Sequence, residues 1–207
     1  MEITKLNLNG LVKTGLGTDW EPQISDGAIR VLNKCDSTTE QLHLLGAAYY
    51  IEKTRDKYQG ECSGQPLPII SCVIKHNEIS YEGIWFVCPW GGWLRGLGAG
   101  PSACALVPQL QFPNKNCHHD FGLFYGDSDG GGNWVFQCAI EIDPEPTHRN
   151  RRDKDEYRDQ IVGHDVVRVN GEKYDYVSWF SLIVNRDDEK ILKHCPDDGD
   201  ENDNLPF

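Results

Sequence analysis

The chain has 207 residues, of which 20 are Lys or Arg and 32 are Asp or Glu, so its formal net charge is −12. This length predicts one domain, and a hydrophobic content of 39% excludes wholesale disorder. A negative surface repels phosphate groups, so the charge argues against nucleic acid or an anionic membrane as the main partner. No apolar run approaches the roughly 18–20 residues that a membrane span needs.

One helix is expected in the first quarter of the chain. Ser37 and Glu40 have the Ser-x-x-Glu spacing of a capping box, and an apolar run follows them from Leu42 onward. Gly46 weakens this prediction, because a glycine inside a helix costs about 1 kcal/mol relative to alanine. The same run also fits a strand through Leu42 and Leu44.

The middle of the chain is rich in Ile, Val, Trp and Phe and predicts a series of short strands. A polar turn at 76–78 joins the first two of these strands as a hairpin, and the last one alternates apolar and polar residues with a period of two. The expected strands are Ile69–Lys75, Ile79–Cys88, Ala103–Phe112, Phe121–Tyr125 and Trp134–Ile142.

The last third carries 10 bases and 18 acids, and its clearest signal is Asn170-Gly171. This dipeptide favours a type I′ turn and predicts a hairpin between Val166–Val169 and Tyr174–Val184. Many short strands with Gly and Pro turns indicate a mainly β protein at the margin of α+β. We therefore expect an antiparallel β-sandwich or barrel with one short helix in a single domain over 1–195, followed by a solvated acidic tail over 196–207.

The cysteines bear on the cellular compartment. No secretory signal is visible at the start of the chain and no C-x-x-C pair occurs, so we expect a cytoplasmic protein with reduced thiols. A secreted protein is the minority alternative, because an even number of cysteines also fits a disulfide framework. The eight residues are Cys35, Cys62, Cys72, Cys88, Cys104, Cys117, Cys138 and Cys195.

The segment Cys117-His118-His119-Asp120 concentrates a nucleophile, two imidazoles and a carboxylate. An imidazole lowers the pKa of a thiol, and a carboxylate holds an imidazole in one tautomer, so Cys117, His119 and Asp120 are candidate catalytic residues. Alternation along a strand places Cys117 and His119 on one face and His118 and Asp120 on the other, which leaves a distant acid to orient His119. An ordinary polar loop before a strand explains the same residues.

Two short patterns suggest a divalent metal. His118 and Asp120 have the His-x-Asp spacing of two ligands in an iron or zinc site. Asp127 and Asp129, followed by three glycines, resemble the start of a calcium loop, although its twelfth position falls on Cys138 where a Glu is required. The cofactor expectation is therefore Ca, or Zn or Fe, and an Asp/Gly hairpin turn is the alternative explanation of the second pattern.

An aromatic and glycine-rich run occupies 85–100. Trp90 and Trp93 follow Pro89, so we expect them in an exposed loop, where an indole suits stacking on a sugar ring or anchoring a partner protein. Arg95 follows them as a polar contact. The glycines lack the Gly-x-Gly-x-x-Gly spacing of a dinucleotide site, and no Gly-Lys-Ser/Thr exists to form a P-loop.

These patterns predict a binding module that recognises a small molecule or a glycan, with carbohydrate as the leading class. Trp90, Trp93 and Arg95 would contact the ligand, together with the Asp/Gly loop at 127–133. The first alternative is an enzyme with a Cys/His or metal-dependent site at 117–120. The second is an acidic interaction or assembly protein that binds a basic protein partner.

Overall fold

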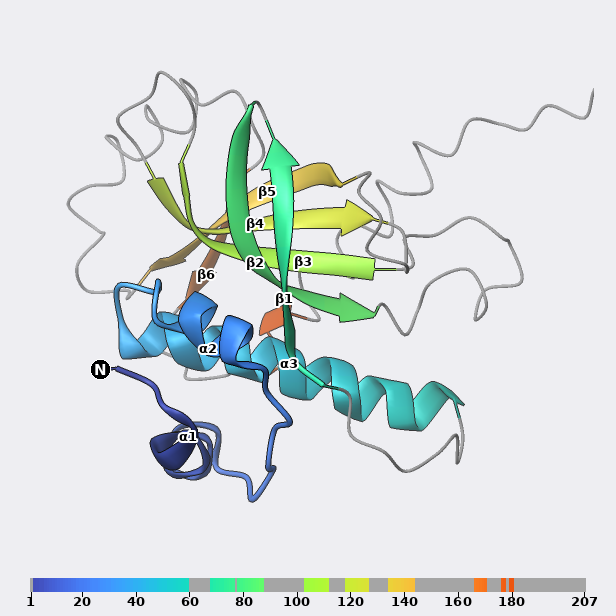
Figure 1. The fold of residues 1–207 in the computed structure, drawn as a ribbon. Helices are drawn as coiled ribbons and strands as arrows, with labels where there is room; N and C mark the ends of the chain where they lie inside the picture. The colour runs from blue at the N-terminus through green and yellow to red at the C-terminus, as the bar shows by residue number, and fades with distance from the viewer. Residues whose placement is uncertain are drawn as a thin grey trace, which may run out of the picture.

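A computed structural model describes residues 2–59, 68–76, 78–87, 103–111, 118–126, 134–143, 166–170, 176–177 and 179–180. Within these ranges, several helices cover one face of a six-stranded sheet (Figure 1). The helices are α1 (Lys5–Leu11), the π-helical turn η1 (Val12–Leu16), α2 (Asp26–Leu32) and α3 (Thr38–Gln59). The strands are β1 (Ile70–His76), β2 (Ile79–Val87), β3 (Ala103–Gln111), β4 (His118–Gly126), β5 (Val135–Asp143) and β6 (Val166–Asn170).

The sheet follows the order of the chain, β1-β2-β3-β4-β5-β6. Neighbouring strands from β1 to β5 are antiparallel, and β6 alone runs parallel to its neighbour β5. The predicted first hairpin is confirmed, with His76 opposite Ile79 and a left-handed backbone at Glu78 (φ 67°) in the turn. The three remaining expected strands, Ala103–Phe112, Phe121–Tyr125 and Trp134–Ile142, correspond to β3, β4 and β5 and are confirmed as well.

The mainly β class is confirmed, but two finer parts of the fold prediction are not. The sheet is mixed and does not close into a barrel, and the described residues form a single sheet rather than the two of a sandwich. The prediction of one short helix is wrong, because α3 alone has 22 residues and α1 and α2 precede it. The acidic tail at 196–207 lies outside the described residues.

Helix α3 begins where the capping box predicts. The side chain of Ser37 accepts a hydrogen bond from the backbone N–H of Glu40 at 3.1 Å, as the motif requires. The Glu40 carboxylate in return accepts from the Ser37 hydroxyl at 2.8 Å and from the backbone N–H of Asp36 at 3.0 Å. The strand alternative through Leu42 and Leu44 is therefore wrong.

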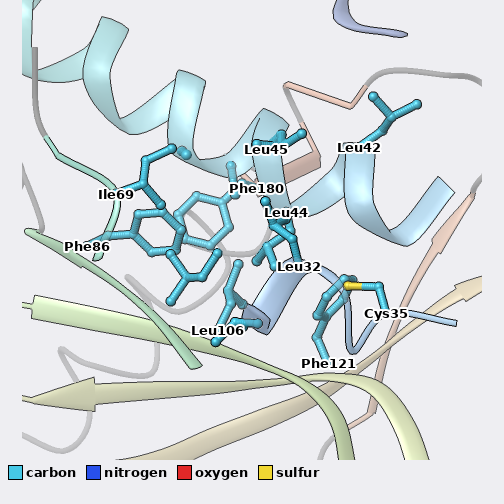
Figure 2. Close-up of a cluster of buried hydrophobic side chains, with 14 of the residues drawn as sticks. Leu32, Cys35, Leu42, Leu44, Leu45, Ile69, Phe86, Leu106, Phe121 and Phe180 are labelled. Carbon is cyan, nitrogen blue, oxygen red and sulfur yellow. The ribbon is translucent and has the colours of Figure 1, made fainter. Parts of the chain in front are cut away.

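The main core lies between the helices and the sheet (Figure 2). Leu44 and Leu45 of α3 and Leu32 of α2 face Leu106 and Phe121 of the sheet, and all five are fully buried. Such side chains stabilise a fold by roughly 1.5–3 kcal/mol each when they leave water. This layer fixes α3 across the strands and so determines which strand ends each half of the helix reaches.

A second apolar cluster lies on the other face of the sheet, where Ile74, Val107, Leu110 and Phe124 are buried together. The sheet is strongly coiled, and Figure 1 shows β1 and β2 running across β3, β4 and β5. The ring of His76 on β1 consequently lies 5.5 Å from that of Phe124 and 5.4 Å from that of Phe136, three and four strands away in the sheet order.

The segment after β6 differs from the prediction. The strand predicted over Tyr174–Val184 is wrong at its described residues, because 176–177 form a turn and 179–180 are helical, whereas the turn at Asn170-Gly171 lies at the edge of the described residues and stays a prediction. Tyr176, Trp179 and Phe180 have the i, i+3, i+4 spacing of a helical face and are buried against α3. The Trp179 indole donates to the backbone carbonyl of His43 at 3.0 Å, which fixes this segment on the helix.

Candidate functional site

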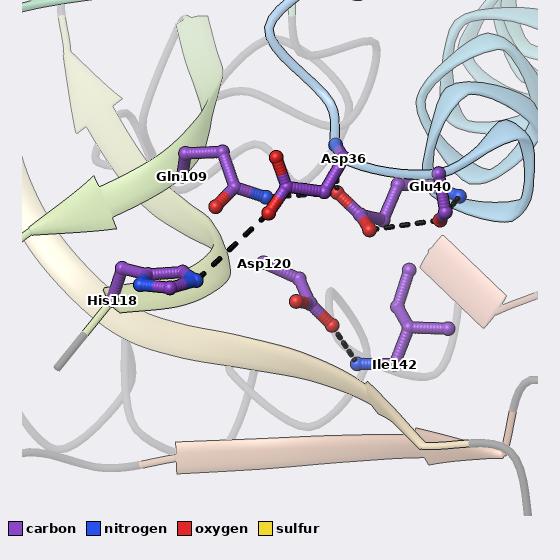
Figure 3. A network of polar contacts seen from close by, with 7 residues as sticks. Asp36, Glu40, Gln109, His118, Asp120 and Ile142 are labelled. Atoms are coloured by element: carbon purple, nitrogen blue, oxygen red, sulfur yellow. Dashed lines mark hydrogen bonds and ion pairs between the residues drawn. The ribbon is translucent and has the colours of Figure 1, made fainter. Parts of the chain in front are cut away.

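Polar side chains gather where α2 leads into α3 and where β3 ends and β4 begins (Figure 3). We call this group, Asp36, Glu40, Gln109, His118 and Asp120, the polar end of the molecule. It contains two of the residues singled out by the sequence, His118 and Asp120. Cys117, the predicted nucleophile, lies outside the described residues.

Glu40 ties the start of α3 to the sheet. Besides its two capping contacts, its carboxylate accepts a hydrogen bond from the side-chain amide of Gln109 at 2.9 Å. Gln109 has a left-handed backbone (φ 52°) near the end of β3. Glu40 is itself buried, so all of these contacts lie in a poorly hydrated region where hydrogen bonds hold geometry firmly. The Glu40 carboxylate therefore has a structural role.

His118 and His119 point to different partners, as alternation along the strand predicts. The His118 Nε2 atom lies 4.0 Å from an Asp36 carboxylate oxygen, with both side chains more than half exposed. His119 is fully buried, and its Nδ1 atom lies 2.5 Å from Oε1 of Glu141 on the neighbouring strand β5. The sequence expected a distant acid to orient His119, and the structure identifies it as Glu141.

The Asp120 side chain also has a structural role, because it binds the neighbouring strand of the sheet. Its carboxylate accepts a hydrogen bond from the backbone N–H of Ile142 at 2.7 Å. It also lies close enough to Cys35 to act on that thiol: burial raises the pKa of Cys35 well above its usual range, and the carboxylates of Glu40, Asp120 and Asp36 raise it further. Cys35 is thus held as a neutral thiol.

The side chains of the other described cysteines are also wholly or partly buried. Cys104 and Cys138 are buried in the core, and burial raises the pKa of Cys72 to about 11. A thiol must ionise to act as a nucleophile or as a metal ligand, so these residues behave as small apolar side chains. Cys35 and Cys72 carry free thiols.

Among the residues that the structure describes, no group of three or more His, Cys, Asp and Glu side chains is arranged to hold a metal ion. His118 and Asp120 are the two described members of the predicted metal set. Asp127 and Asp129 lie outside the described residues, so the calcium-loop hypothesis stays a prediction.

The opposite end of the sheet carries the strand ends that flank the other candidate residues. Val87 pairs with Ala103, and Ala103 pairs with Gly126, so the end of β2, the start of β3 and the end of β4 lie in one row. Tyr125 pairs with Val135 at the start of β5. We call this the loop end. Trp90, Trp93 and Arg95 belong to the connection between β2 and β3 and lie outside the described residues.

A small cavity of about 40 Å³ lies at the loop end, between the second half of α3 and the first hairpin. Most of its wall is apolar, including Ile51, Ile69 and Phe86, and its two polar side chains are Glu52 and Trp85. Trp85 belongs to the aromatic and glycine-rich run at 85–100 but was not a candidate binding residue, and Glu52 had no predicted role. Only the fold brings a residue of α3 next to the end of β2, so no local pattern could have found this pair.

The described residues form a mixed six-stranded sheet with helices on one face. Comparisons of the chain with protein-family models, with curated proteins and with solved structures found no match. Among the described residues, none of the helices has the length and apolar character that crossing a lipid bilayer requires.

Proposed function

We propose that the chain is a binding module whose ligand site lies at the loop end of the sheet, with a carbohydrate as the leading ligand class. The supporting observation is the row of strand ends at Val87, Ala103 and Gly126. The connection that contains Trp90, Trp93 and Arg95 joins the first two of these residues. The connection that contains Asp127 and Asp129 starts directly after the third. Both candidate loops are therefore anchored on adjacent strands at one end of the sheet.

The polar end supports a binding function indirectly, because its chemistry-bearing groups are used by the fold. Glu40 caps α3 and Asp120 accepts from the backbone of β5. Burial raises the pKa of the Cys35 and Cys72 thiols, and the described residues contain no group of three or more side chains that could hold a metal ion. Binding residues are often placed on loops that a rigid sheet holds in position, and the candidate indoles and carboxylates belong to such connections.

The test is binding of the full chain to a glycan array. Trp90→Ala and Trp93→Ala should each weaken binding at least tenfold, because stacking on a sugar ring needs the indole face. Leu6→Ala is the matched control. Leu6 is 97% exposed on α1, so this substitution removes an exposed apolar side chain away from the loop end. Undiminished binding in both tryptophan variants would overturn the proposal.

An enzyme at 117–120 is the second candidate, and the His119–Glu141 hydrogen bond favours it. A base held by an acid at Nδ1 is two thirds of a nucleophile–base–acid triad. This candidate requires a Cys117 thiol with a lowered pKa. Peptide mapping after brief iodoacetamide treatment of the native protein decides it: selective labelling of Cys117 supports the enzyme, and labelling only after unfolding removes it.

An acidic protein that captures a basic partner is the third candidate. Its basis is the net charge of −12. Such a complex should weaken steeply as salt rises, because exposed charges are screened beyond roughly 10 Å at 0.1 M ionic strength. Native mass spectrometry across a salt series, with a basic protein such as a histone as probe, separates this outcome from glycan binding.

A further inference from the structure

The outer edge of β1 carries backbone groups that none of the described strands pairs with. β1 is the first strand of the sheet, so β2 covers only one of its two edges (Figure 1). On the other edge, the Ile69 N–H donates to the Gln23 carbonyl at 2.6 Å, and the Ile69 carbonyl accepts from the Ser25 N–H at 3.0 Å. The chain turns into α2 directly after Ser25, so these bonds cover the edge only where β1 begins.

Alternation along β1 shows which of its backbone groups face outward. In an antiparallel pair every second residue bonds to the neighbouring strand, and the residues between them direct their N–H and C=O groups away from it. Ile69 points to the outer edge, so Ser71, Val73 and Lys75 do so as well, and on that side none of the three bonds to a described residue. Such a row of donors and acceptors is a template on which another strand can pair.

The side chains beside this edge follow the same period of two. Ser71, Val73 and Lys75 share one face of β1, whereas Cys72 and Ile74 belong to the second apolar cluster on the other face. Val73 is 61% exposed and is one of three exposed large apolar side chains among the described residues. A strand added to this edge would therefore meet one apolar side chain with a polar residue on either side.

A cation flanks Val73 in each direction along the edge. Lys75 follows it and is exposed. Arg30 of α2 is also exposed and lies beside Ser71, because a Cβ atom at Gly27 would be 2.1 Å from the Ser71 Oγ atom and 3.7 Å from an Arg30 Nη atom. Both ends of the outward-facing row therefore carry a positive charge.

The carboxylates near this edge do not neutralise these two cations. Asp26 and Glu82 are each paired with a lysine at 2.7 Å. Glu78 lies in the turn, beyond the last paired residue of β1. Neither Arg30 nor Lys75 forms an ion pair with a described residue. The edge is thus locally basic, although the net charge of the chain is −12.

This charge pattern decides between two kinds of added strand. Two copies of the chain that paired through β1, antiparallel and centred on Val73, would bring Lys75 of one copy next to Ser71 and Arg30 of the other. Like charges placed opposite each other destabilise a sheet, so the pattern disfavours a second copy. An extended segment with a carboxylate on each side of an apolar residue matches all three positions.

We propose that the outer edge of β1 is a docking site for an extended acidic segment of a partner protein, which adds to the sheet as a further strand. Its apolar residue lies on Val73, and acidic residues two positions before and after it approach Arg30 and Lys75. This inference goes beyond the proposed function, because it uses neither Trp90 nor Trp93 and is tested without a glycan.

The experiment titrates the full chain with the peptide acetyl-Thr-Asp-Thr-Val-Thr-Asp-Thr-amide and follows the backbone amides by ¹H–¹⁵N NMR. The amide signals of Ser71, Val73 and Lys75 should shift downfield saturably and exchange more slowly with solvent, because each N–H gains an acceptor. The amides of Cys72 and Ile74, which the register directs to β2, should change least. This alternation distinguishes strand addition from a contact made through side chains alone.

Two control peptides separate the backbone contribution from the charge contribution. A peptide with both aspartates replaced by lysine keeps every backbone group and reverses the charge. A fully N-methylated acidic peptide keeps the charge and loses every backbone donor. Each should bind at least tenfold more weakly than the parent peptide, because strand addition needs both the ladder and the matching charges.

Lys75→Gln tests the contribution of the protein, with Lys53→Gln as the matched control. Both lysines are exposed and both substitutions change the net charge equally, but Lys53 lies on α3. Lys75→Gln should weaken binding of the acidic peptide about threefold, as expected for an exposed ion pair, and Lys53→Gln should leave it unchanged.

Four results would overturn the inference. The first is the absence of a saturable change at Ser71, Val73 and Lys75. The second is equal affinity for the acidic peptide and either control peptide. The third is an equal effect of the two lysine substitutions. The fourth is slow exchange of the same amides without peptide that increases with protein concentration, because the added strand would then come from a second copy of the chain.

Discussion

Helix α3 joins two ends of the molecule that differ in how their polar groups are satisfied. At the polar end, Glu40 and Asp120 each accept from backbone or side-chain donors, and His119 is bonded to Glu141. At the loop end, the Trp85 N–H is buried without an acceptor among the described residues. Satisfied groups stabilise a fold, whereas an unsatisfied buried group lowers stability and calls for a functional explanation.

The largest expected effect tests whether the polar end is structural. Removing one partner of a buried, hydrogen-bonded pair leaves the other unsatisfied, so Glu141→Ala should lower the free energy of unfolding by roughly 3–5 kcal/mol. Asp36→Ala is the matched carboxylate control. Its side chain is 70% exposed and 4.0 Å from His118, and such surface pairs contribute about 0–1 kcal/mol. Urea denaturation measures both variants.

A double variant shows whether the pair is needed for anything besides packing. His119→Phe with Glu141→Leu replaces the pair by apolar side chains of similar size, which in buried pairs is often neutral for stability. We expect the double variant to be more stable than Glu141→Ala. A Glu141→Ala variant within 1 kcal/mol of the parent protein would contradict the structural role of the polar end.

The second effect is a pH dependence that arises from His43 in the first half of α3. Burial lowers the pKa of His43 from 6.5 to about 4, while its hydrogen bond to the Thr39 carbonyl acts in the opposite direction. Between these two values the unfolded chain binds a proton that the folded chain does not, so stability rises with pH in this window. Acidification from pH 7 to pH 4 should therefore cost up to about 3 kcal/mol through this residue.

The control for the pH dependence is His43→Asn, which keeps a polar atom near the Thr39 carbonyl and does not titrate. The difference between its stability and that of the parent protein should shrink or reverse as the pH falls from 6.5 to 4. Parallel curves of unfolding free energy against pH for the two proteins would show that another group carries the effect.

Features that depend on neighbouring residues in the chain were predictable from the sequence. The capping box at Ser37 and Glu40 located the start of α3, because both halves of the motif lie within one helical turn. Alternation located β5, and the polar turn at 76–78 located the first hairpin. Alternation also separated His119 from His118 correctly.

Features that depend on contacts between distant parts of the chain were not predictable. Glu141 meets His119 only because β4 and β5 are neighbours, and Glu52 and Trp85 line one cavity only because α3 crosses the sheet. Alternation and β-branched content suggested a strand over Tyr174–Val184, yet Tyr176, Trp179 and Phe180 are buried against α3 and residues 179–180 are helical. The free energy gained by burying a large apolar surface exceeds the local conformational preference of a short segment.

The smallest predicted effect concerns Gly46, where local propensity and packing demand opposite outcomes. Alanine is a better helix former than glycine by about 1 kcal/mol, so propensity alone predicts that Gly46→Ala stabilises the protein. A Cβ atom at this position, however, would lie 1.6 Å from the backbone oxygen of Tyr176, which cannot rotate away. The whole segment that carries Trp179 would have to move, so we expect a net loss of roughly 1–3 kcal/mol.

Gly10→Ala is the matched control, because Gly10 lies in α1 and a Cβ there would have no neighbour within 4 Å. This variant should gain up to about 1 kcal/mol from helix propensity alone. Thermal or urea unfolding of both variants measures whether each substitution raises or lowers the free energy of unfolding. If Gly46→Ala also stabilises the protein, the close approach of Tyr176 to α3 is wrong. The first half of the helix would then not be tightly packed, and it would no longer differ in this respect from the second half beside the cavity.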